Sequence, residues 1–100
     1  METFGEYIRQ LRTNAGFTIR NIAQQLDVDP AFLGRIEKDK QSANKKIIAG
    51  IARIFNQSEK DLFNRFLSDR IAYKIIKENA DISVLKTAEK KVEYLKSKAK

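Results

Sequence analysis

The sequence contains no cysteine and no histidine, and these two absences exclude much of the chemistry that proteins perform. Disulfides and thiolate nucleophiles need cysteine, the usual zinc sites need cysteine or histidine, and the commonest acid–base schemes need histidine. Apolar runs are short as well, and none approaches the ~20 residues that a membrane-spanning helix needs. We therefore expect no catalytic site, no metal site, no cofactor and no membrane insertion.

Proline and glycine are also scarce, with one and four residues, which leaves little turn chemistry for a β-protein. The hydrophobic fraction of 42%, with six phenylalanines, argues for a folded chain, and 100 residues suit one domain with a modest core. The acidic residues are scattered, and no glycine-rich phosphate loop appears. We expect an all-α protein that is not an enzyme.

The charge of the chain is strongly positive, with a formal net value of +7. This excess favours a polyanionic partner, most simply nucleic acid, although charge alone fits a merely soluble basic protein equally well. Met1 and Glu2 are followed by charged, amphipathic sequence instead of the apolar run of a signal peptide. We expect a cytoplasmic location.

Residues 17–38, FTIRNIAQQLDVDPAFLGRIEK, predict two short helices joined by a tight turn. The second begins at Asp29-Pro30, because aspartate accepts backbone N–H bonds at an N-cap and proline fits the first helical position. The first begins at Thr18, after Gly16, which suits the end of a preceding helix. Helices this short need a supporting core. A helix-turn-helix that presents its second helix to the DNA major groove explains their length.

Other helices are predicted on both sides of this pair. Thr3 and Glu6 have capping-box spacing at the start of a helix over about 4–15. Asn44 is the expected N-cap of a helix at roughly 45–55, which should be the most buried element. Apolar residues at helical spacing predict an inward face that comprises Phe4, Tyr7, Ile8, Leu11, Ile19, Ile22, Ala23, Leu26, Leu33, Ile36, Ile47, Ile48, Ile51, Ala52, Ile54, Phe55, Leu62, Phe63, Phe66 and Leu67.

The next helix should begin at Ser58, with Asp61 in its first turn, and the pattern changes after Leu67. Ser68-Asp69 either starts a new helix or lies inside a long one. Residues 79–81 predict a break, and Ser83 is the expected cap of a last helix. In that helix the residues spaced three and four apart are Leu85, Ala88, Val92, Leu95 and Ala99.

This spacing is that of a coiled-coil seam, and it fits equally a helix laid on the domain. We expect residues 1–67 to form the DNA-binding domain. Residues 68–100 should form a helical extension that dimerises or packs as part of the same compact unit. The dimerisation candidates are Ile71, Ile75, Leu85, Val92 and Leu95.

Residues 4–67 resemble the lambda-repressor/Cro-type (XRE) helix-turn-helix domain, a five-helix DNA-binding bundle. The resemblance lies in four elements at family distances: IRQLR at 8–12, GFT at 16–18, IAQQL at 22–26 and LGRIEK at 33–38. Small members of the family include restriction-modification controllers, phage-type repressors and antitoxins. The C-terminal third resembles helical extensions that some members carry for dimerisation.

The resemblance implies roles for single residues. Arg12 and Glu37 match a buried structural ion pair, which agrees with the need of a buried charge for a partner. Thr18 matches a residue at the start of the second helix that abuts the DNA backbone. The family commonly has glutamine at the next position, and Ile19 cannot make its contacts. Arg20 either replaces that phosphate contact or is a solvated side chain.

The second helix of the pair is the expected recognition helix. Its base-facing candidates are Pro30, Ala31, Phe32, Gly34 and Arg35. Pro30, Ala31 and Phe32 can make apolar contacts with thymine methyl groups. Alternatively, the Phe32 ring lies in the core of the protein. A glycine at position 34 either lets the helix backbone approach DNA closely or is needed for packing within the protein. The two-pronged guanidinium of Arg35 matches guanine O6 and N7. The phosphate candidates are Thr18, Arg20, Lys38, Lys40, Ser42 and Lys45. The alternative is a simple N-cap for Thr18, which is compatible with the contact, and a solvated surface charge for Arg20 and each lysine.

The sequence therefore predicts a transcription regulator that binds double-stranded DNA as a homodimer on a palindromic operator. The alternative is an antitoxin or adaptor whose C-terminal helices bind a partner protein such as a toxin or polymerase. The operator, the direction of regulation and the genetic context do not follow from the sequence.

Overall fold

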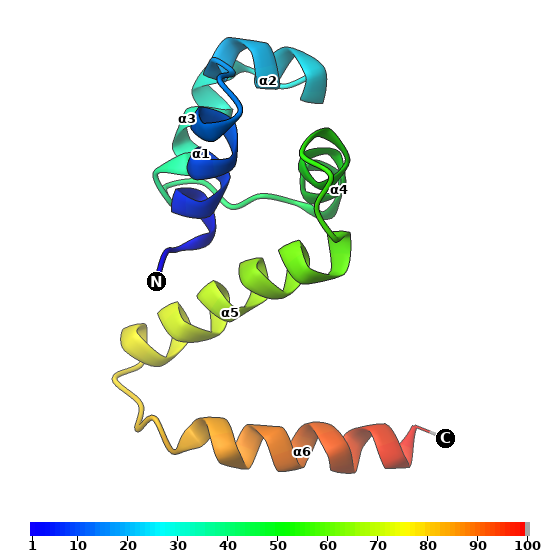
Figure 1. Ribbon diagram of the computed structural model, residues 1–100. Coiled ribbons are helices and arrows are strands. Elements are labelled where there is room, and N and C mark those ends of the chain that lie inside the picture. Colours follow the sequence, from blue (N-terminus) through cyan, green and yellow to red (C-terminus); the bar gives the residue numbers. More distant parts are fainter. Residues whose placement is uncertain (100) are drawn as a thin grey trace. The chain divides into compact units, whose positions relative to one another are not determined.

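A computed structural model describes residues 1–99 of the chain, which form six helices and no strand (Figure 1). The all-α class is confirmed. The contacts group Met1–Asp69 into one compact unit, here called the bundle, and the residues from Arg70 onward into a second, here called the C-terminal segment. The helices are α1 (Phe4–Asn14), α2 (Ile19–Leu26), α3 (Pro30–Glu37), α4 (Lys45–Ile54), α5 (Glu59–Lys77) and α6 (Val84–Lys98).

Helix α1 begins and ends as the sequence predicts. The Thr3 side chain accepts a hydrogen bond from Glu6 N, and the Glu6 side chain accepts one from Thr3 N, which completes the capping box. After the helix, Gly16 adopts a φ of +78°, a left-handed conformation that glycine takes without steric cost.

The helix-turn-helix is formed by α2 and α3. Thr18 accepts from Asn21 N, and Asp29 accepts from Ala31 N with Pro30 at the first helical position, so both predicted N-caps are confirmed. Between the helices, Asp27 adopts a φ of +57° and ends α2. Helix α3 packs against both α1 and α2, and α4 packs against α2.

The core lies where these helices meet. Helix α4 supplies more buried residues than any other described helix, as predicted. Gly50 of α4 is pressed against Leu26 of α2, where an added Cβ would lie 2.6 Å from Leu26 Cδ2. The buried apolar side chains are Phe4, Ile8, Ile22, Ala23, Leu33, Ile36, Ala43, Ile47, Ile48, Ile51, Ala52 and Leu62.

Helix α5 settles the choice that the sequence leaves open at Ser68-Asp69. It begins after Ser58, whose side chain accepts from Asp61 N, and continues without a break to Lys77. Its first turns belong to the bundle, where Leu62 is buried and Phe63 and Phe66 pack against the core. Leu67, predicted to face inward, keeps 39% of its surface exposed.

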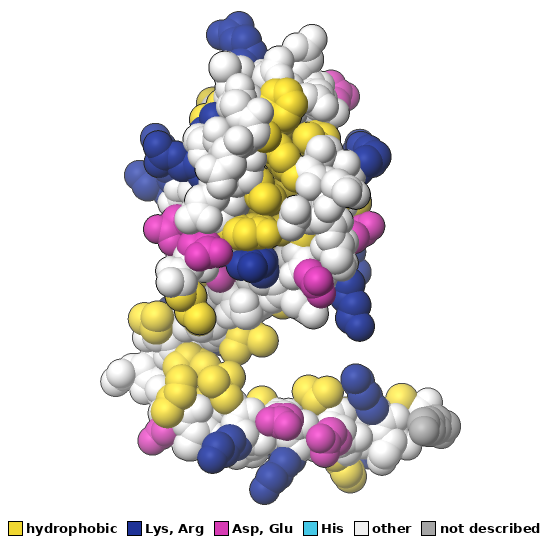
Figure 2. Space-filling view, in the orientation of Figure 1, with side chains coloured by type: hydrophobic (Ala, Val, Ile, Leu, Met, Phe, Trp, Pro, Cys, Tyr) yellow, Lys and Arg dark blue, Asp and Glu magenta, His cyan; other side chains and the backbone are white. Residues whose placement is uncertain are grey.

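The C-terminal segment contains the last turns of α5 and the whole of α6, and none of its described residues is buried. Hydrophobic side chains lie uncovered over the last turns of α5 and at several points along α6 (Figure 2). Asn79 ends α5 with a φ of +52°, which agrees with the predicted break. No helix among residues 1–99 is long and apolar enough to cross a membrane.

The predicted cap of α6 needs a correction. Ser83 occupies the N-cap position, but its side chain makes no capping hydrogen bond because its backbone is already helical. The Asp81 side chain instead accepts a hydrogen bond from Ser83 N at 2.8 Å. This bond lowers the pKa of the exposed Asp81 carboxyl below its usual value.

Candidate nucleic-acid interface

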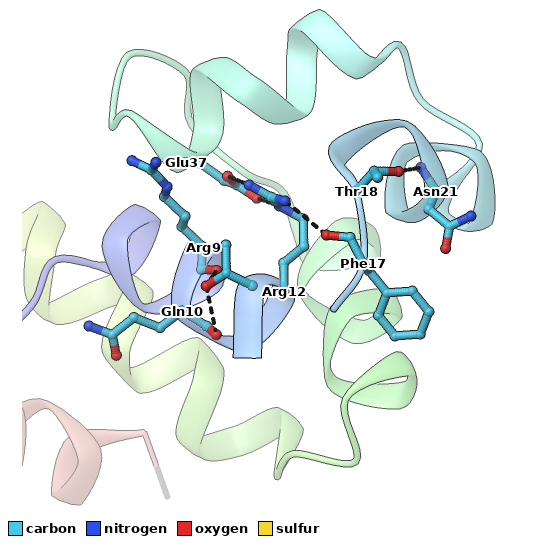
Figure 3. Close-up of polar contacts among 8 residues, drawn as sticks. Arg9, Gln10, Arg12, Phe17, Thr18, Asn21 and Glu37 are labelled. Carbon is cyan, nitrogen blue, oxygen red and sulfur yellow. Dashed lines mark hydrogen bonds and ion pairs between the residues drawn. The ribbon is translucent and has the colours of Figure 1, made fainter. Parts of the chain in front are cut away.

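Arg12 of α1 and Glu37 at the end of α3 meet in a two-pronged ion pair (Figure 3). Arg12 Nε donates to Glu37 Oε2 at 2.8 Å, and Arg12 Nη2 donates to Glu37 Oε1 at 3.0 Å. The Glu37 side chain is 4% exposed and the Arg12 side chain 12%. The hydrogen bond to Glu37 raises the pKa of the Arg12 guanidinium above its usual value.

The same guanidinium also fixes the loop that leads into α2. Arg12 Nη1 donates to the backbone oxygen of Phe17 at 2.9 Å, next to Thr18 (Figure 3). Arg12 therefore links α1, the end of α3 and the start of α2. One side chain of α1 thus contacts the end of α3 and the residue just before the N-cap of α2, and so holds both helices of the helix-turn-helix.

Thr18 lies exposed at the start of α2, where its oxygen accepts from Asn21 N at 3.1 Å (Figure 3). Because the oxygen serves as the acceptor, the hydroxyl proton is left to donate outward. The N-cap role and a phosphate contact are compatible at this residue. Ile19 is half-buried and packs against the core, so it has no polar role.

The outer face of α3 exposes three of the five base-facing candidates, which are Pro30, Ala31 and Arg35. The Arg35 guanidinium lies 5.9 Å from the centre of the Phe32 ring. A ring at that distance attracts the cation and limits its freedom. Arg35 is therefore an exposed donor with a preferred direction.

Phe32 and Gly34 lie less openly on the same helix. Phe32 is half-buried and packs against the core, so the structure gives its ring the core position that the sequence leaves as its alternative. An added Cβ at Gly34 would meet only Ile19 Cδ1, at 3.9 Å, which is an ordinary contact. The bundle therefore has room for a larger residue at position 34, and packing gives no reason for glycine there.

The phosphate candidates are spread around the ends of α2, α3 and α4. Arg20, Lys38 and Lys40 are exposed. The Ser42 hydroxyl donates to Ala43 O at 3.2 Å. The Lys45 ammonium lies 5.4 Å from the centre of the Phe63 ring, beside a pocket that Ile48, Glu59 and Lys60 also line. Lys45 is exposed as well but lies against α5, so Arg20, Lys38 and Lys40 are the better candidates.

A family model described as a helix-turn-helix domain matches residues 5–66. The chain belongs to this helix-turn-helix family. Its resemblance to the XRE type is thereby confirmed, and the family consists of DNA-binding regulators. No curated protein matches the sequence.

Two solved structures share the fold of this helix-turn-helix protein. One is the clp gene regulator ClgR from Corynebacterium glutamicum, 21% identical over 76% of this chain and 80% of that chain, with a TM-score of 0.57. The other is SinR, from a complex of the SinR protein with the SinI protein, 15% identical over 95% of this chain and 99% of that chain, with a TM-score of 0.56. The match to the family model is what places the chain with DNA-binding regulators.

Two residues that bear on the interface have no role in the sequence analysis. Asp39 has a φ of +61° and accepts hydrogen bonds from Gly5 N and Thr3 Oγ1. Gly5 lies so close to the end of α3 that an added Cβ would be 2.7 Å from Glu37 O. A glycine inside a helix is a sign of close approach, but the sequence does not show which element approaches.

The dimerisation candidates all belong to the C-terminal segment. Ile75 is half-buried, and the other four, Ile71, Leu85, Val92 and Leu95, are exposed in the structure of the single chain. They remain candidates on the ground that their apolar surface is uncovered.

The positive charge of the chain is unevenly divided. Residues 1–69 carry eleven basic and nine acidic residues, a net charge of +2, whereas residues 70–100 carry nine basic and four acidic residues, a net charge of +5. The excess charge that favours a polyanionic partner thus lies mostly outside the bundle. Within the bundle, recognition depends on where a few cations are placed.

Proposed function

We propose that the protein is a transcription regulator that binds a specific double-stranded DNA sequence through α3 and acts as a homodimer on a palindromic operator. The observation that carries this proposal is the exposed face of α3, with Arg35 over the Phe32 ring, on a frame fixed by Arg12 and Glu37. A short helix whose end is held by an ion pair and whose outer face is exposed suits insertion into a major groove.

Each part of this face has a defined chemical role in the proposal. Arg35 donates to O6 and N7 of a guanine, the commonest specific contact in major grooves. Pro30 and Ala31 contact thymine methyl groups. The start of α2 at Thr18, with Arg20 and the lysines after α3, contacts phosphates and sets the register without reading bases.

The experiment is a selection of operator sequences from random duplexes by the full-length protein, followed by binding measurements on single-base variants of the selected site. Arg35→Ala should lose about 1–3 kcal/mol at one base position and leave the others unchanged. Arg53→Ala is the matched control, because Arg53 is an exposed arginine at the end of α4 outside the proposed interface. Unchanged discrimination in Arg35→Ala would refute the assignment of base reading to this residue.

The homodimer is proposed from the C-terminal segment. A helix of 15 residues such as α6, with no buried residue, is marginal in water by itself. Its exposed leucines and valines at a and d spacing favour a partner helix. A second copy supplies that partner and brings two recognition helices to two half-sites.

Sedimentation of the full-length protein at micromolar concentration tests the dimer, with Val92→Lys as a variant that places a charge in the proposed seam. We expect a dimer for the wild type and a monomer for Val92→Lys. A wild type that is monomeric alone and on its operator would remove the homodimer from the proposal.

A second candidate function is an antitoxin or adaptor that binds a partner protein through the C-terminal segment. One observation favours it: four charged residues flank the seam of α6, and three of them, Lys91, Lys96 and Lys98, are basic. Like charges oppose pairing with a second copy, and an acidic amphipathic helix complements them. The SinR neighbour was solved in complex with a different protein, SinI.

Purification from the native cell distinguishes the two functions. Recovery of a second, acidic protein in stoichiometric amount, lost in Lys91→Glu, supports the adaptor. A homogeneous preparation of this chain alone that dimerises supports the regulator.

A further inference from the structure

The start of α1 is held by more side chains than its own capping box supplies. All of its first four backbone N–H groups, which have no acceptor inside a helix, are accepted by side chains. Thr3 N and Glu6 N bind within the capping box, Phe4 N donates to Asp69 Oδ2 at 2.7 Å, and Gly5 N donates to Asp39 Oδ1 at 3.1 Å. Two of the four acceptors therefore come from distant segments, Asp69 from α5 and Asp39 from the end of α3.

Asp39 also ends the recognition helix. Asp39 N donates to Ile36 O at 3.1 Å, and Lys40 N donates to Arg35 O at 2.8 Å, the pair of bonds of a Schellman motif. The residue that turns left-handed in this motif is usually glycine, because a side chain there is strained. Aspartate also adopts this conformation, and Asp27 does so at +57° without a side-chain hydrogen bond to another described residue, so the conformation alone gives Asp39 no special role.

Asp39 differs from Asp27 in the contacts of its carboxylate. Its two oxygens accept from Gly5 N and from Thr3 Oγ1, so one side chain joins the last turn of α3 to the first turn of α1. Gly5 leaves no space between the two backbones at this point. The Arg12–Glu37 pair joins the same two helices further along α1. Two polar contacts that are spaced along α1 therefore hold the end of α3, in addition to the packing of α3 against α1 and α2.

We propose that Asp39 is a positioning residue for DNA recognition, whose carboxylate holds the end of α3 on α1 and so sets the angle at which the helix enters the groove. The proposal rests on the proposed DNA-binding function of α3. Asp39 does not touch DNA in this role. It acts through the placement of Arg35 and its neighbours.

Asp39 also caps α1 and ends α3 with a positive φ, and the chain offers a control variant for each of these two roles. Asp69 also accepts one N–H of the first turn of α1, but from α5, so Asp69→Ala removes a cap without touching α3. Asp27 is also an aspartate with positive φ, +57°, at the end of a helix, and its side chain has no hydrogen bond to another residue among those described. Asp27→Gly therefore measures the relief of backbone strain alone.

The test compares Asp39→Gly with both controls in the full-length protein, well below the melting temperature of each variant. Asp39→Gly loses both hydrogen bonds of the carboxylate and should bind the selected operator roughly tenfold more weakly, because part of the binding energy is then needed to hold α3 at its angle. Its affinity for unrelated duplexes should be unchanged, because the phosphate contacts remain. Asp69→Ala and Asp27→Gly should keep the wild-type ratio of specific to nonspecific affinity. Asp39→Asn, which keeps an acceptor oxygen, should recover most of the loss.

A second readout needs no DNA. Residual dipolar couplings should show a changed or broadened angle between α1 and α3 in Asp39→Gly and not in Asp27→Gly or Asp69→Ala. An unchanged angle, or equal loss of specificity in Asp39→Gly and Asp69→Ala, overturns the positioning role. Failure of the wild type to select any duplex would instead overturn the proposed function, and the angle measurement would still decide the role of Asp39 in placing α3.

Discussion

Leu33 and Ile51 of the bundle are fully buried, whereas Val92 and Leu95 of the C-terminal segment are 51% and 60% exposed. Both regions have apolar residues at helical spacing, so periodicity alone does not separate them. The difference is that α3 packs against α1 and α2, while no described residue of α6 is buried. Helical spacing predicts that a helix has an apolar face, and the number of neighbouring elements decides whether the face is covered.

The two regions also differ in how they satisfy backbone groups. In the bundle, α1 begins with four N–H groups that are all accepted by side chains. In the C-terminal segment, α6 begins at Ser83 without a side-chain cap, and one bond from Asp81 supports the preceding turn. The helix starts of the bundle are therefore satisfied by contacts within the single chain, including distant ones, whereas the start of α6 depends on one local bond.

Removal of the C-terminal segment is the strongest test of this comparison. A chain that ends at Tyr73 keeps Asp69, which caps α1, and loses α6 with most of the uncovered apolar surface. We expect a folded monomer whose affinity for the palindrome falls by about 10²–10⁴, since two tethered sites no longer act together. Sedimentation and binding to whole and half operators measure this.

The position of the cut provides its own control. Truncation after Leu67 also removes Asp69, so it should lower the melting temperature below that of the chain ending at Tyr73. If the chain ending at Tyr73 does not fold, the bundle is not complete by itself and the comparison fails.

The local signals in the sequence predict the bundle well. Thr3 with Glu6, Thr18, Asp29-Pro30, Asn44 and Ser58 each mark the start of a helix, because an N-cap bond joins residues only two or three apart. The inward faces of α3 and α4 follow from periodicity for the same local reason. These signals suffice for a five-helix bundle.

What the sequence cannot predict are bonds between distant segments. Asp39 and Asp69 reach residues 34 and 65 positions away, and nothing in their neighbourhood marks them as caps of α1. Asp27, Asp39, Asn56 and Asn79 take positive φ at helix ends, where glycine is the usual signal. Phe32 has the same periodicity whether it faces the core or the DNA, so only the packing of neighbours places its ring.

A matched pair of leucines tests the same comparison one residue at a time. Leu33→Ala should lower the free energy of unfolding of the bundle by about 2–5 kcal/mol, because it leaves a cavity among fully buried side chains. Leu95→Ala should change it by no more than about 0.5 kcal/mol, as exposed positions usually do. Chemical denaturation at a concentration where the protein is monomeric measures both. Equal losses would mean that α6 is covered within the single chain.

The contribution of the Arg12–Glu37 ion pair to the stability of the bundle can be measured directly. Glu37→Ala leaves the Arg12 charge without its partner, and we expect a loss of about 3 kcal/mol of stability, near the lower bound for a broken buried pair because Arg12 keeps a 12% exposed edge. Lys74→Ala is the control in the C-terminal segment, where Lys74 and Glu78 form an exposed pair at 3.7 Å and the loss should be too small to detect. A wild-type melting temperature for Glu37→Ala would contradict a structural role for the pair.

Gly34 offers the smallest and sharpest prediction, because it is a helical position of the bundle where packing leaves room. Gly34→Ala should raise the free energy of unfolding by up to about 1 kcal/mol, since alanine has the higher helix propensity and its methyl group meets only Ile19 at an ordinary distance. If the glycine lets the backbone of α3 approach DNA, the same variant should bind the operator more weakly although it is more stable. Thermal denaturation and operator binding, measured on one preparation, separate the two effects. Gly5→Ala is the control, and it should be destabilised because its methyl group would overlap the carbonyl oxygens at the end of α3. A Gly34→Ala variant that gains stability and keeps full affinity would show that the methyl group does not meet the DNA, and a close approach of the α3 backbone to DNA would then not explain the glycine.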